Sequence, residues 1–178
     1  YGQSSLRRVD IATGEVRQRV DLSADYFAEG LALWDGTLVQ LTWHEEKAFR
    51  WDLDGFGSLG EFDYPTQGWG LTTDAAGFVM SDGSAQLYFR DPTTFAETAR
   101  VEIRDSRGPL TRLNELERIG SEVWANVWQT ESVARIDPAT GAVTGWIDLS
   151  GLLTPDEDAA ADVLNGIAWD EATGRIWV

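Results

Sequence analysis

The sequence predicts an all-β chain of the β-propeller class, because a pattern of short strands recurs along its 178 residues. One strand of each copy ends in aspartate, at Asp10, Asp52, Asp91 and Asp137, with separations of 42, 39 and 46 residues. A repeat of this period, with each copy built from several short strands, is typical of propeller blades. We therefore expect a single β-propeller domain over residues 1–178, made of four-stranded antiparallel blades.

The blades follow one another in chain order. The expected strand groups are two outer strands over 4–10 and 15–22, complete blades over 29–64, 68–104 and 114–149, and two strands over 165–178. This is about four blades' worth of chain. The two partial blades either pair with each other to close a ring of four or belong to a larger propeller. We favour the larger propeller, because a ring with open edges exposes unpaired strands.

The first strand of each copy has a small or polar lead, and the second strand ends in polar or aromatic residues. The first strands open with Glu29-Gly30-Leu31, Gly68-Trp69-Gly70-Leu71, Asn114-Glu115-Leu116 and Asn165-Gly166-Ile167. No window has a helical period. Only residues 154–162, which are acidic and rich in alanine, predict one helical turn or a surface loop.

Composition limits the classes of function. The chain has no cysteine and only one histidine, His44, which excludes a thiolate nucleophile and a zinc site. The net charge of −16 argues against nucleic acid as a partner, since phosphate binding requires a basic surface. No apolar run is long enough to cross a membrane. We interpret the acidic charge as a source of solubility, although it would also attract a cationic ligand such as a peptide's amino terminus.

Five residues occupy matching places in successive copies, at the start of a first strand or the end of a second. They are Glu29, Trp43, Trp69, Asn114 and Trp128. Equivalent positions of a repeat fall on the same face of a ring, so these side chains are expected to meet at one mouth of the central channel.

Each of these residues also has a purely structural interpretation. Glu29 either caps a loop or acts as a general acid/base, since an apolar frame raises a carboxyl pKa. Asn114 either forms a turn or binds substrate. The tryptophans at strand ends either bind a ligand or pack, and we favour binding. The remaining tryptophans are expected to pack between blades: Trp34, Trp51, Trp124, Trp146, Trp169 and Trp177.

Several segments in order carry a family resemblance, from Tyr1 to the last residue. They are Tyr26-Phe27-Ala28-Glu29-Gly30-Leu31, Leu41-Thr42-Trp43, Gln67-Gly68-Trp69-Gly70-Leu71, Leu113-Asn114-Glu115-Leu116-Glu117, Ala125-Asn126-Val127-Trp128-Gln129-Thr130 and Asp162-Val163-Leu164-Asn165-Gly166-Ile167-Ala168. The chain resembles the plant and bacterial type of glutaminyl cyclase. The resemblance implies a five-bladed propeller that converts amino-terminal glutamine of peptides to pyroglutamate with release of ammonia, without a metal or other cofactor.

The resemblance also implies roles for residues. Glu29 and Asn114 are the expected catalytic residues, as the acid/base and the amide that binds substrate. The expected substrate-binding residues are Trp43, Gln67, Trp69, Trp128 and Asn165. In the family a Thr-Gln-Gly-Leu segment would precede Tyr1 and a Thr-Gly-Lys segment would follow Val178. A secreted or periplasmic monomer is expected.

The chemistry suits these residues. The α-amine attacks the side-chain carboxamide of the same residue, so the enzyme mainly holds a cyclising conformer. Glu29 delivers a proton to the departing ammonia, while Asn114 and an indole N–H hold the carboxamide or its oxyanion.

Two alternatives stay open. One is a calcium-type lactonase, with Glu29, Asn114, Asn165 and Asp82 around a cation. The other is a propeller that binds peptides without catalysis. Three indoles at the mouth favour the cyclase over the lactonase, whose cation needs oxygen ligands more than aromatic walls.

Overall fold

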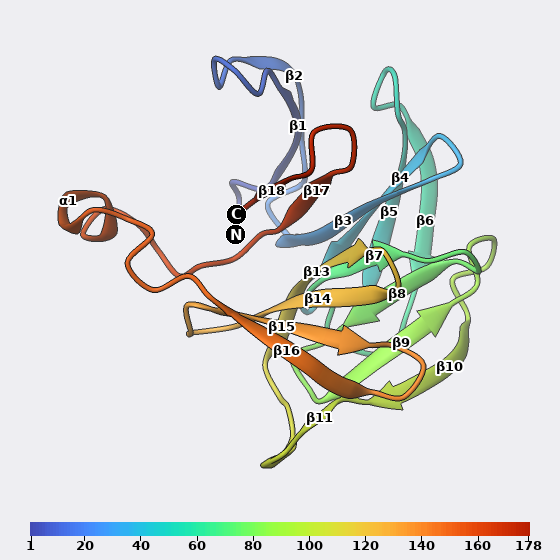
Figure 1. Cartoon of the computed structure of the whole chain (residues 1–178). Helices are drawn as coiled ribbons and strands as arrows, with labels where there is room; N and C mark the ends of the chain where they lie inside the picture. Colours follow the sequence, from blue (N-terminus) through green and yellow to red (C-terminus); the bar gives the residue numbers. More distant parts are fainter.

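The computed structural model describes all 178 residues and consists of antiparallel β-sheets arranged around a common centre (Figure 1). Three sheets contain complete four-stranded blades, in which consecutive strands pair in order. The strands of these blades are β3 (Ala28–Trp34), β4 (Thr37–Thr42), β5 (Lys47–Asp52) and β6 (Ser58–Asp63); β7 (Leu71–Thr73), β8 (Phe78–Ser81), β9 (Gln86–Arg90) and β10 (Glu97–Glu102); and β13 (Leu113–Ile119), β14 (Glu122–Val127), β15 (Ser132–Asp137) and β16 (Ala142–Asp148).

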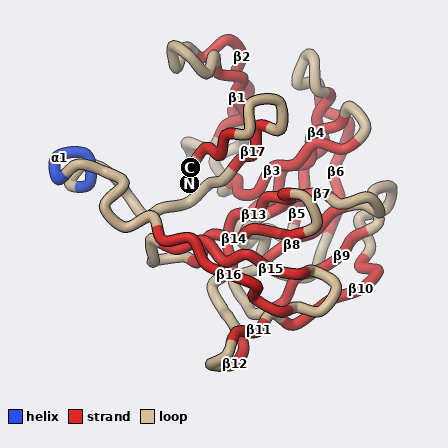
Figure 2. Tube along the Cα trace, in the orientation of Figure 1, coloured by secondary structure: helices blue, strands red, loops and turns tan.

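The remaining elements are short. Two hairpins form separate two-stranded sheets, β1 (Ser5–Val9) with β2 (Val16–Asp21), and β17 (Ala168–Asp170) with β18 (Arg175–Trp177). The strands β11 (Arg104–Asp105) and β12 (Gly108–Pro109) extend the third blade, with β11 parallel to β16. The one helix, α1 (Pro155–Asp158), is a single turn on a projecting loop (Figure 2).

The predicted all-β propeller fold is confirmed, and so is the order of its strands. The two partial blades do not pair with each other, so the ring of four closed by their pairing is not formed. Two first strands begin later than predicted, at Leu71 rather than Gly68 and at Ala168 rather than Asn165. For β7 the reason is that Gly70 donates its N–H to the hydroxyl of Ser81, 2.8 Å away, instead of to a backbone carbonyl.

The first strands lie at the centre and pack against one another, β3 beside β7, β7 beside β13, and β13 beside β17. The Gly30 N–H donates to the Trp69 carbonyl of the next blade at 2.8 Å. A Cβ added at Gly70 would lie 2.1 Å from the Asn114 carbonyl oxygen, so this contact requires glycine. Successive blades are thus held together at backbone distance near the channel.

The core consists of two clusters that fill the spaces between blades. One joins the first and second complete blades and includes Leu41, Phe78 and Phe95; the other joins the second and third and includes Val79 and Ile136. Neighbouring residues of β8 enter different clusters because successive side chains of a strand point to opposite faces. The second blade is therefore buried on both faces, which suits an internal blade of a stack.

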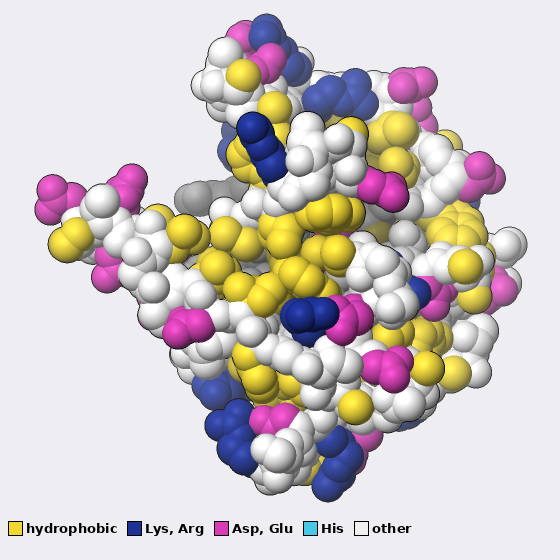
Figure 3. All heavy atoms as spheres, in the orientation of Figure 1, with side chains coloured by type: hydrophobic (Ala, Val, Ile, Leu, Met, Phe, Trp, Pro, Cys, Tyr) yellow, Lys and Arg dark blue, Asp and Glu magenta, His cyan; other side chains and the backbone are white.

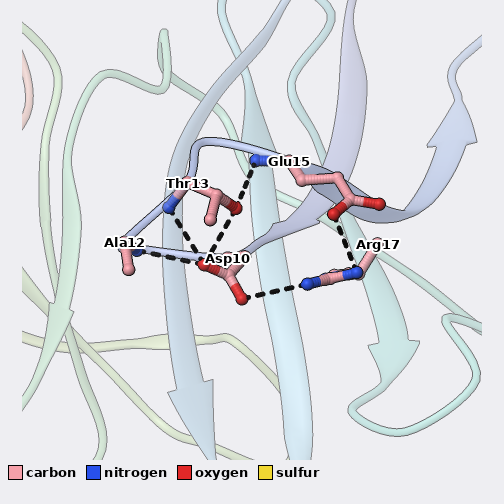
Figure 4. A network of polar contacts seen from close by, with 5 residues as sticks. All are labelled: Asp10, Ala12, Thr13, Glu15 and Arg17. Carbon is pink, nitrogen blue, oxygen red and sulfur yellow. Dashed lines mark hydrogen bonds and ion pairs between the residues drawn. The ribbon is translucent and has the colours of Figure 1, made fainter.

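The recurring aspartates close the turn between the third and fourth strand of each blade. Figure 4 shows the first of them, where a carboxylate oxygen of Asp10 accepts the N–H groups of Ala12 and Thr13 at 3.1 and 3.0 Å. Asp91 binds Thr93 and Thr94 in the same way, at 2.9 and 2.8 Å. The period of the sequence is thus a period of turns stabilised by aspartate.

The predicted helical turn is confirmed, and a capping box explains it. The side chain of Thr154 accepts the N–H of Glu157, while the side chain of Glu157 accepts the N–H of Thr154. This turn is far too short to span a membrane, and the chain has no other helix.

Two of the tryptophans expected to pack between blades do not. Trp146 in β16 and Trp177 in β18 are 42% and 40% exposed, because β16 is the fourth strand of its blade and β18 belongs to a two-stranded sheet. On the face shown in Figure 3, hydrophobic side chains gather over β17, β13 and β14, while acidic side chains are scattered over the rest of the face. The acidic charge is not concentrated in one patch on that face.

Candidate active site

A cavity of about 540 Å³ brings together six of the seven predicted site residues. Its lining consists of Phe27, Ala28, Glu29, Trp43, Trp69, Asn114, Glu115, Trp128, Asp162, Val163, Asn165 and Gly166. The structure therefore has the predicted convergence of one carboxyl, one amide and three indoles, those of Glu29, Asn114, Trp43, Trp69 and Trp128. The seventh residue, Gln67, lies behind two of the indoles.

Glu29 and Asn114 are presented by equivalent irregularities of two first strands. The pairing of β3 with β4 shifts register between Ala28 and Leu31, and the pairing of β13 with β14 shifts between Leu113 and Leu116. A β-bulge re-aims a side chain relative to the regular sheet. The two shifts lie at the same step of the repeat, which is why residues from different blades face one cavity.

The backbone around the indoles is fixed by bonds between neighbouring loops. The backbone N–H of Trp43 donates to the Phe27 carbonyl at 2.9 Å, and the backbone N–H of Gly68 donates to the Trp43 carbonyl at 2.9 Å. Gly68 is tightly enclosed, since an added Cβ would lie 2.6 Å from the Thr42 carbonyl oxygen. The backbone N–H of Trp128 donates to the Arg112 carbonyl at 2.9 Å.

The side chain of Gln67 fixes two of the three indoles. Its carbonyl oxygen accepts the indole N–H of Trp43 and that of Trp69, both at 3.0 Å. Gln67 was predicted as a substrate-binding residue. In the structure it does not line the cavity, and its carbonyl oxygen binds two indoles that do. Of the three predicted wall residues, only Trp128 keeps an indole N–H free to hold a substrate oxygen.

The aromatic wall is continued by ring contacts. Trp69 and Trp128 meet edge to face, with ring centroids 5.5 Å apart and an interplanar angle of 81°. Phe27 packs against Trp43 at 5.7 Å. Such contacts restrict the rings and leave an apolar surface on which a side chain can be placed.

Asn114 is a buried side chain with an acceptor to spare. Only 5% of the residue is exposed, and its amide oxygen has no hydrogen-bond partner within the chain. Its backbone carbonyl accepts the hydroxyl of Ser81 at 2.7 Å, which holds β13 against the second blade. An unpartnered buried polar atom costs free energy, so a ligand that bonds to it gains affinity.

Burial controls the charge of two carboxyl groups in the cavity, those of Glu29 and Glu115. Desolvation raises the pKa of Glu29 from 4.5 to about 7. Burial, with the negative charges of Glu29 and Glu117, raises the pKa of Glu115 to about 8. A carboxyl that titrates near neutrality can both give and take a proton at physiological pH. Sequence reasoning passed over Glu115, although it lies in a motif that identified Asn114.

The residues proposed as lactonase ligands are not all together. Glu29, Asn114 and Asn165 line the cavity, but Asp82 does not. Its carboxylate accepts the hydroxyl of Tyr88 at 2.9 Å and the backbone N–H of Ser84 at 3.0 Å. His44 is exposed, with its ring against that of Trp43.

A second cavity of about 700 Å³ adjoins the first and shares Asp162, Val163 and Asn165 with it. Its other lining residues come from the segment after β14, from the loop around α1 that begins after β16, and from Val178. The candidate site is thus open toward a further hollow on the side of Asn165.

The fold and the cavity together define a class of protein, a β-propeller with an acidic, aromatic-walled site where its first strands meet. The particular family follows from comparison with known proteins. The chain belongs to the glutamine cyclotransferase family, whose model matches residues 1–178.

Individual relatives agree with this assignment. A glutaminyl-peptide cyclotransferase of Arabidopsis thaliana is 41% identical over 187 residues, covering 99% of this chain and 58% of that protein. The crystal structure of Myxococcus xanthus glutaminyl cyclase matches with a TM-score of 0.86 at 35% identity, over 97% of this chain and 75% of that one. The chain thus spans less than two thirds of the length of the curated relative.

More distant structures show the fold alone. The WD40 domain of Neurospora crassa Pan2 matches with a TM-score of 0.56 at 10% identity, over 96% of this chain and 64% of that domain. The family membership, rather than this general likeness, bears on function.

Proposed function

We propose that this chain carries the active site of a glutaminyl-peptide cyclotransferase, which converts the amino-terminal glutamine of peptides to pyroglutamate and releases ammonia. The observation that carries the proposal is the Glu29 carboxyl, whose pKa is raised to about 7 in a cavity walled by three indoles. Family membership supports the same reaction. Because the chain spans 58% of its curated relative, activity is a proposal for the protein that contains it.

Binding is the first contribution of the cavity. The indoles of Trp43, Trp69 and Trp128 enclose the glutamine side chain and hold it folded toward its own α-amine. The free amide oxygen of Asn114 accepts an N–H of the substrate carboxamide. Since the nucleophile and electrophile belong to one residue, fixing their geometry removes much of the barrier.

Proton transfer is the second contribution. The α-amine nitrogen attacks the carboxamide carbon, the new C–N bond closes the five-membered ring, and the carbonyl oxygen becomes an oxyanion. The indole N–H of Trp128 donates to that oxygen. The old C–N bond breaks as protonated Glu29 gives its proton to the leaving nitrogen, and the Glu29 carboxylate then takes the proton of the ring nitrogen. Ammonia leaves and Glu29 is again protonated.

Binding of a ligand without catalysis is the main competing explanation for such a cavity, and a paired substitution separates the two.

We define the extended chain as this sequence with the flanking segments carried by its relatives added at both ends. Glu29→Gln keeps size but cannot donate a proton at neutral pH, so kcat for a glutamine-terminated dipeptide should fall by about 10²–10⁴-fold with little change in KM.

The matched control is Glu171→Gln, the same substitution at an exposed carboxyl in the β17–β18 turn. It should leave ammonia release unchanged. A folded Glu29→Gln variant with normal kcat would remove Glu29 from the mechanism. Absence of ammonia release from the unsubstituted extended chain would overturn the proposed function itself.

A further inference from the structure

The second cavity, of about 700 Å³, adjoins the candidate active site and has no part in the chemistry proposed for that site. The two cavities share Asp162, Val163 and Asn165, which therefore form the boundary between them. All but one of the residues that line the second cavity lie between Gln129 and Asn165. A ligand that is bound in the first cavity and extends across this boundary enters the second.

The walls of the second cavity are apolar and accessible. Leu152, Leu153 and Val163 line it, and they are 60%, 45% and 42% exposed. The backbone N–H of Leu149, another wall residue, donates to the Glu131 carbonyl at 2.8 Å, which fixes the wall to the turn after β14. Apolar side chains gathered in one hollow lose water when a ligand covers them, so they favour an occupant with apolar surface.

The charged side chains of this cavity are all acidic. Glu131, Asp158 and Asp162 line it, and no lysine, arginine or histidine does. None of the three forms an ion pair within the chain. Lysine and arginine side chains lay a hydrocarbon stem along apolar surface and keep the charged head in a polar environment. Apolar walls with unpaired carboxylates therefore suit such a side chain.

The first cavity contains independent evidence for a ligand that reaches this boundary. The Asn114 amide oxygen has no partner within the chain, and the residue is only 5% exposed and lines the first cavity. An unpartnered buried acceptor favours an occupant that bonds to it. When that occupant is an amino-terminal glutamine, the rest of the peptide must leave the first cavity, and the second cavity adjoins it on the side of Asn165.

We propose that the second cavity is the subsite for the residue that follows the amino-terminal glutamine of the substrate, and that it selects lysine or arginine there. This rests on the proposed function and names its substrate class. The stem of the lysine or arginine lies along Leu152, Leu153 and Val163, and its cationic head reaches the carboxylates of Glu131 and Asp158. The glutamine itself stays in the first cavity.

The test compares four tripeptide amides as substrates of the extended chain: Gln-Lys-Ala, Gln-norleucine-Ala, Gln-Ala-Ala and Gln-Glu-Ala. Norleucine has a stem like that of lysine but no charge. The norleucine peptide should have a kcat/KM about tenfold above that of the alanine peptide, because its stem covers the apolar wall. The lysine peptide should exceed the norleucine peptide by about threefold, the usual effect of an accessible ion pair. The glutamate peptide should be the poorest substrate.

A double substitution separates the subsite from the net charge of the protein. Glu131→Gln with Asp158→Asn should lower the ratio of kcat/KM between the lysine and norleucine peptides from about three to about one. The matched control is Asp156→Asn with Glu171→Gln, which removes the same charge from exposed residues that do not line the cavity. Asp156 also lies in the same helical turn as Asp158. The control should keep the ratio near three.

Two results would overturn the proposal. The first is an equal kcat/KM for the lysine and norleucine peptides in the unsubstituted extended chain. The second is an equal fall of their ratio in the double variant and in its control, because the preference would then come from the charge of the whole molecule rather than from this cavity.

A second measurement does not depend on turnover. In calorimetric titrations the product pyroglutamyl-Lys-Ala amide should bind the extended chain about threefold more tightly than pyroglutamyl-norleucine-Ala amide. If this preference is found but no peptide releases ammonia, the cyclase function fails while the site for a cationic side chain stands. If all four peptides release ammonia with one kcat/KM and the two products bind equally, the subsite is overturned while the cyclase function stands.

Discussion

Replacing Gly70 with alanine should disturb both the fold and the candidate site, because this glycine sets the distance between two inner strands. An added Cβ would lie 2.1 Å from the Asn114 carbonyl oxygen and 2.8 Å from the Cα of Glu115. Both neighbours are backbone atoms of β13 and cannot rotate away. The strands must separate by roughly 1 Å to restore an ordinary contact, in a core packed without spare volume.

The size of the effect follows from this displacement. Overpacking of this kind costs about 3 kcal/mol, near the upper end of its usual range. For a chain of this length that corresponds to a melting temperature lower by roughly 6–12 °C. Asn114 and Glu115 move with β13 relative to Glu29, and a misplacement of about 1 Å in a catalytic site costs about 10²-fold in rate.

The assays are thermal unfolding followed by circular dichroism and, in the extended chain, ammonia release from a glutamine-terminated dipeptide. Gly145→Ala is the matched control, because a Cβ there meets only the Arg135 side chain at 3.6 Å, an ordinary contact. The control should keep both its melting temperature and its activity. If Gly70→Ala melts and turns over like Gly145→Ala, the close approach of the blades does not position the site.

Three further outcomes are expected. Gln67→Leu removes the acceptor of two indole N–H groups, and each lost hydrogen bond should cost about 0.5–1.5 kcal/mol of stability, so steady-state kinetics should show KM rising more than kcat falls. Gln67→Glu keeps an acceptor and should have a milder effect. Equal effects of the two substitutions would contradict the role of Gln67 in holding the indoles. Trp69→Ala removes a wall that contacts ground and transition states alike, so steady-state kinetics should show a rise in KM larger than the fall in kcat. The raised pKa values of Glu29 and Glu115 contribute stability that is fully present below about pH 4.5 and is lost as pH rises through about 7 and 8. Melting temperatures measured from pH 5 to pH 8 should therefore decline less in Glu115→Gln than in the unsubstituted chain. Parallel curves for the two proteins would contradict the burial of the Glu115 carboxyl.

The repeat in the sequence was enough to predict the blades and the meeting of site residues. Aspartates at a regular period report turns, and turns of one kind at one period require equivalent strands between them. Equivalent positions in a ring share a face, so Glu29, Trp69 and Asn114 were expected at one mouth and do line one cavity. This reasoning needs only the order of residues and the symmetry of the fold.

The repeat did not predict what each side chain contacts, because that depends on how closely neighbouring blades approach. The two indole N–H groups bound by Gln67 lie in different blade segments, and only the packed ring brings their donors to one oxygen. Glu115 was overlooked for a related reason, since it departs from the glycine that the repeat has at that position. Whether such a departure points into solvent, a core or a cavity is decided by the neighbouring blade.

The sequence by itself thus determined the all-β class, the order of the strands and the meeting of Glu29, Trp69 and Asn114 at one mouth, because hydrophobic alternation and turn chemistry are local properties of the chain. The tertiary structure alone decided the protonation of Glu29 and Glu115, the unpartnered amide oxygen of Asn114 and the failure of the two partial blades to pair. These depend on desolvation and on distances between residues far apart in the sequence, and both arise only when the blades pack around their common centre.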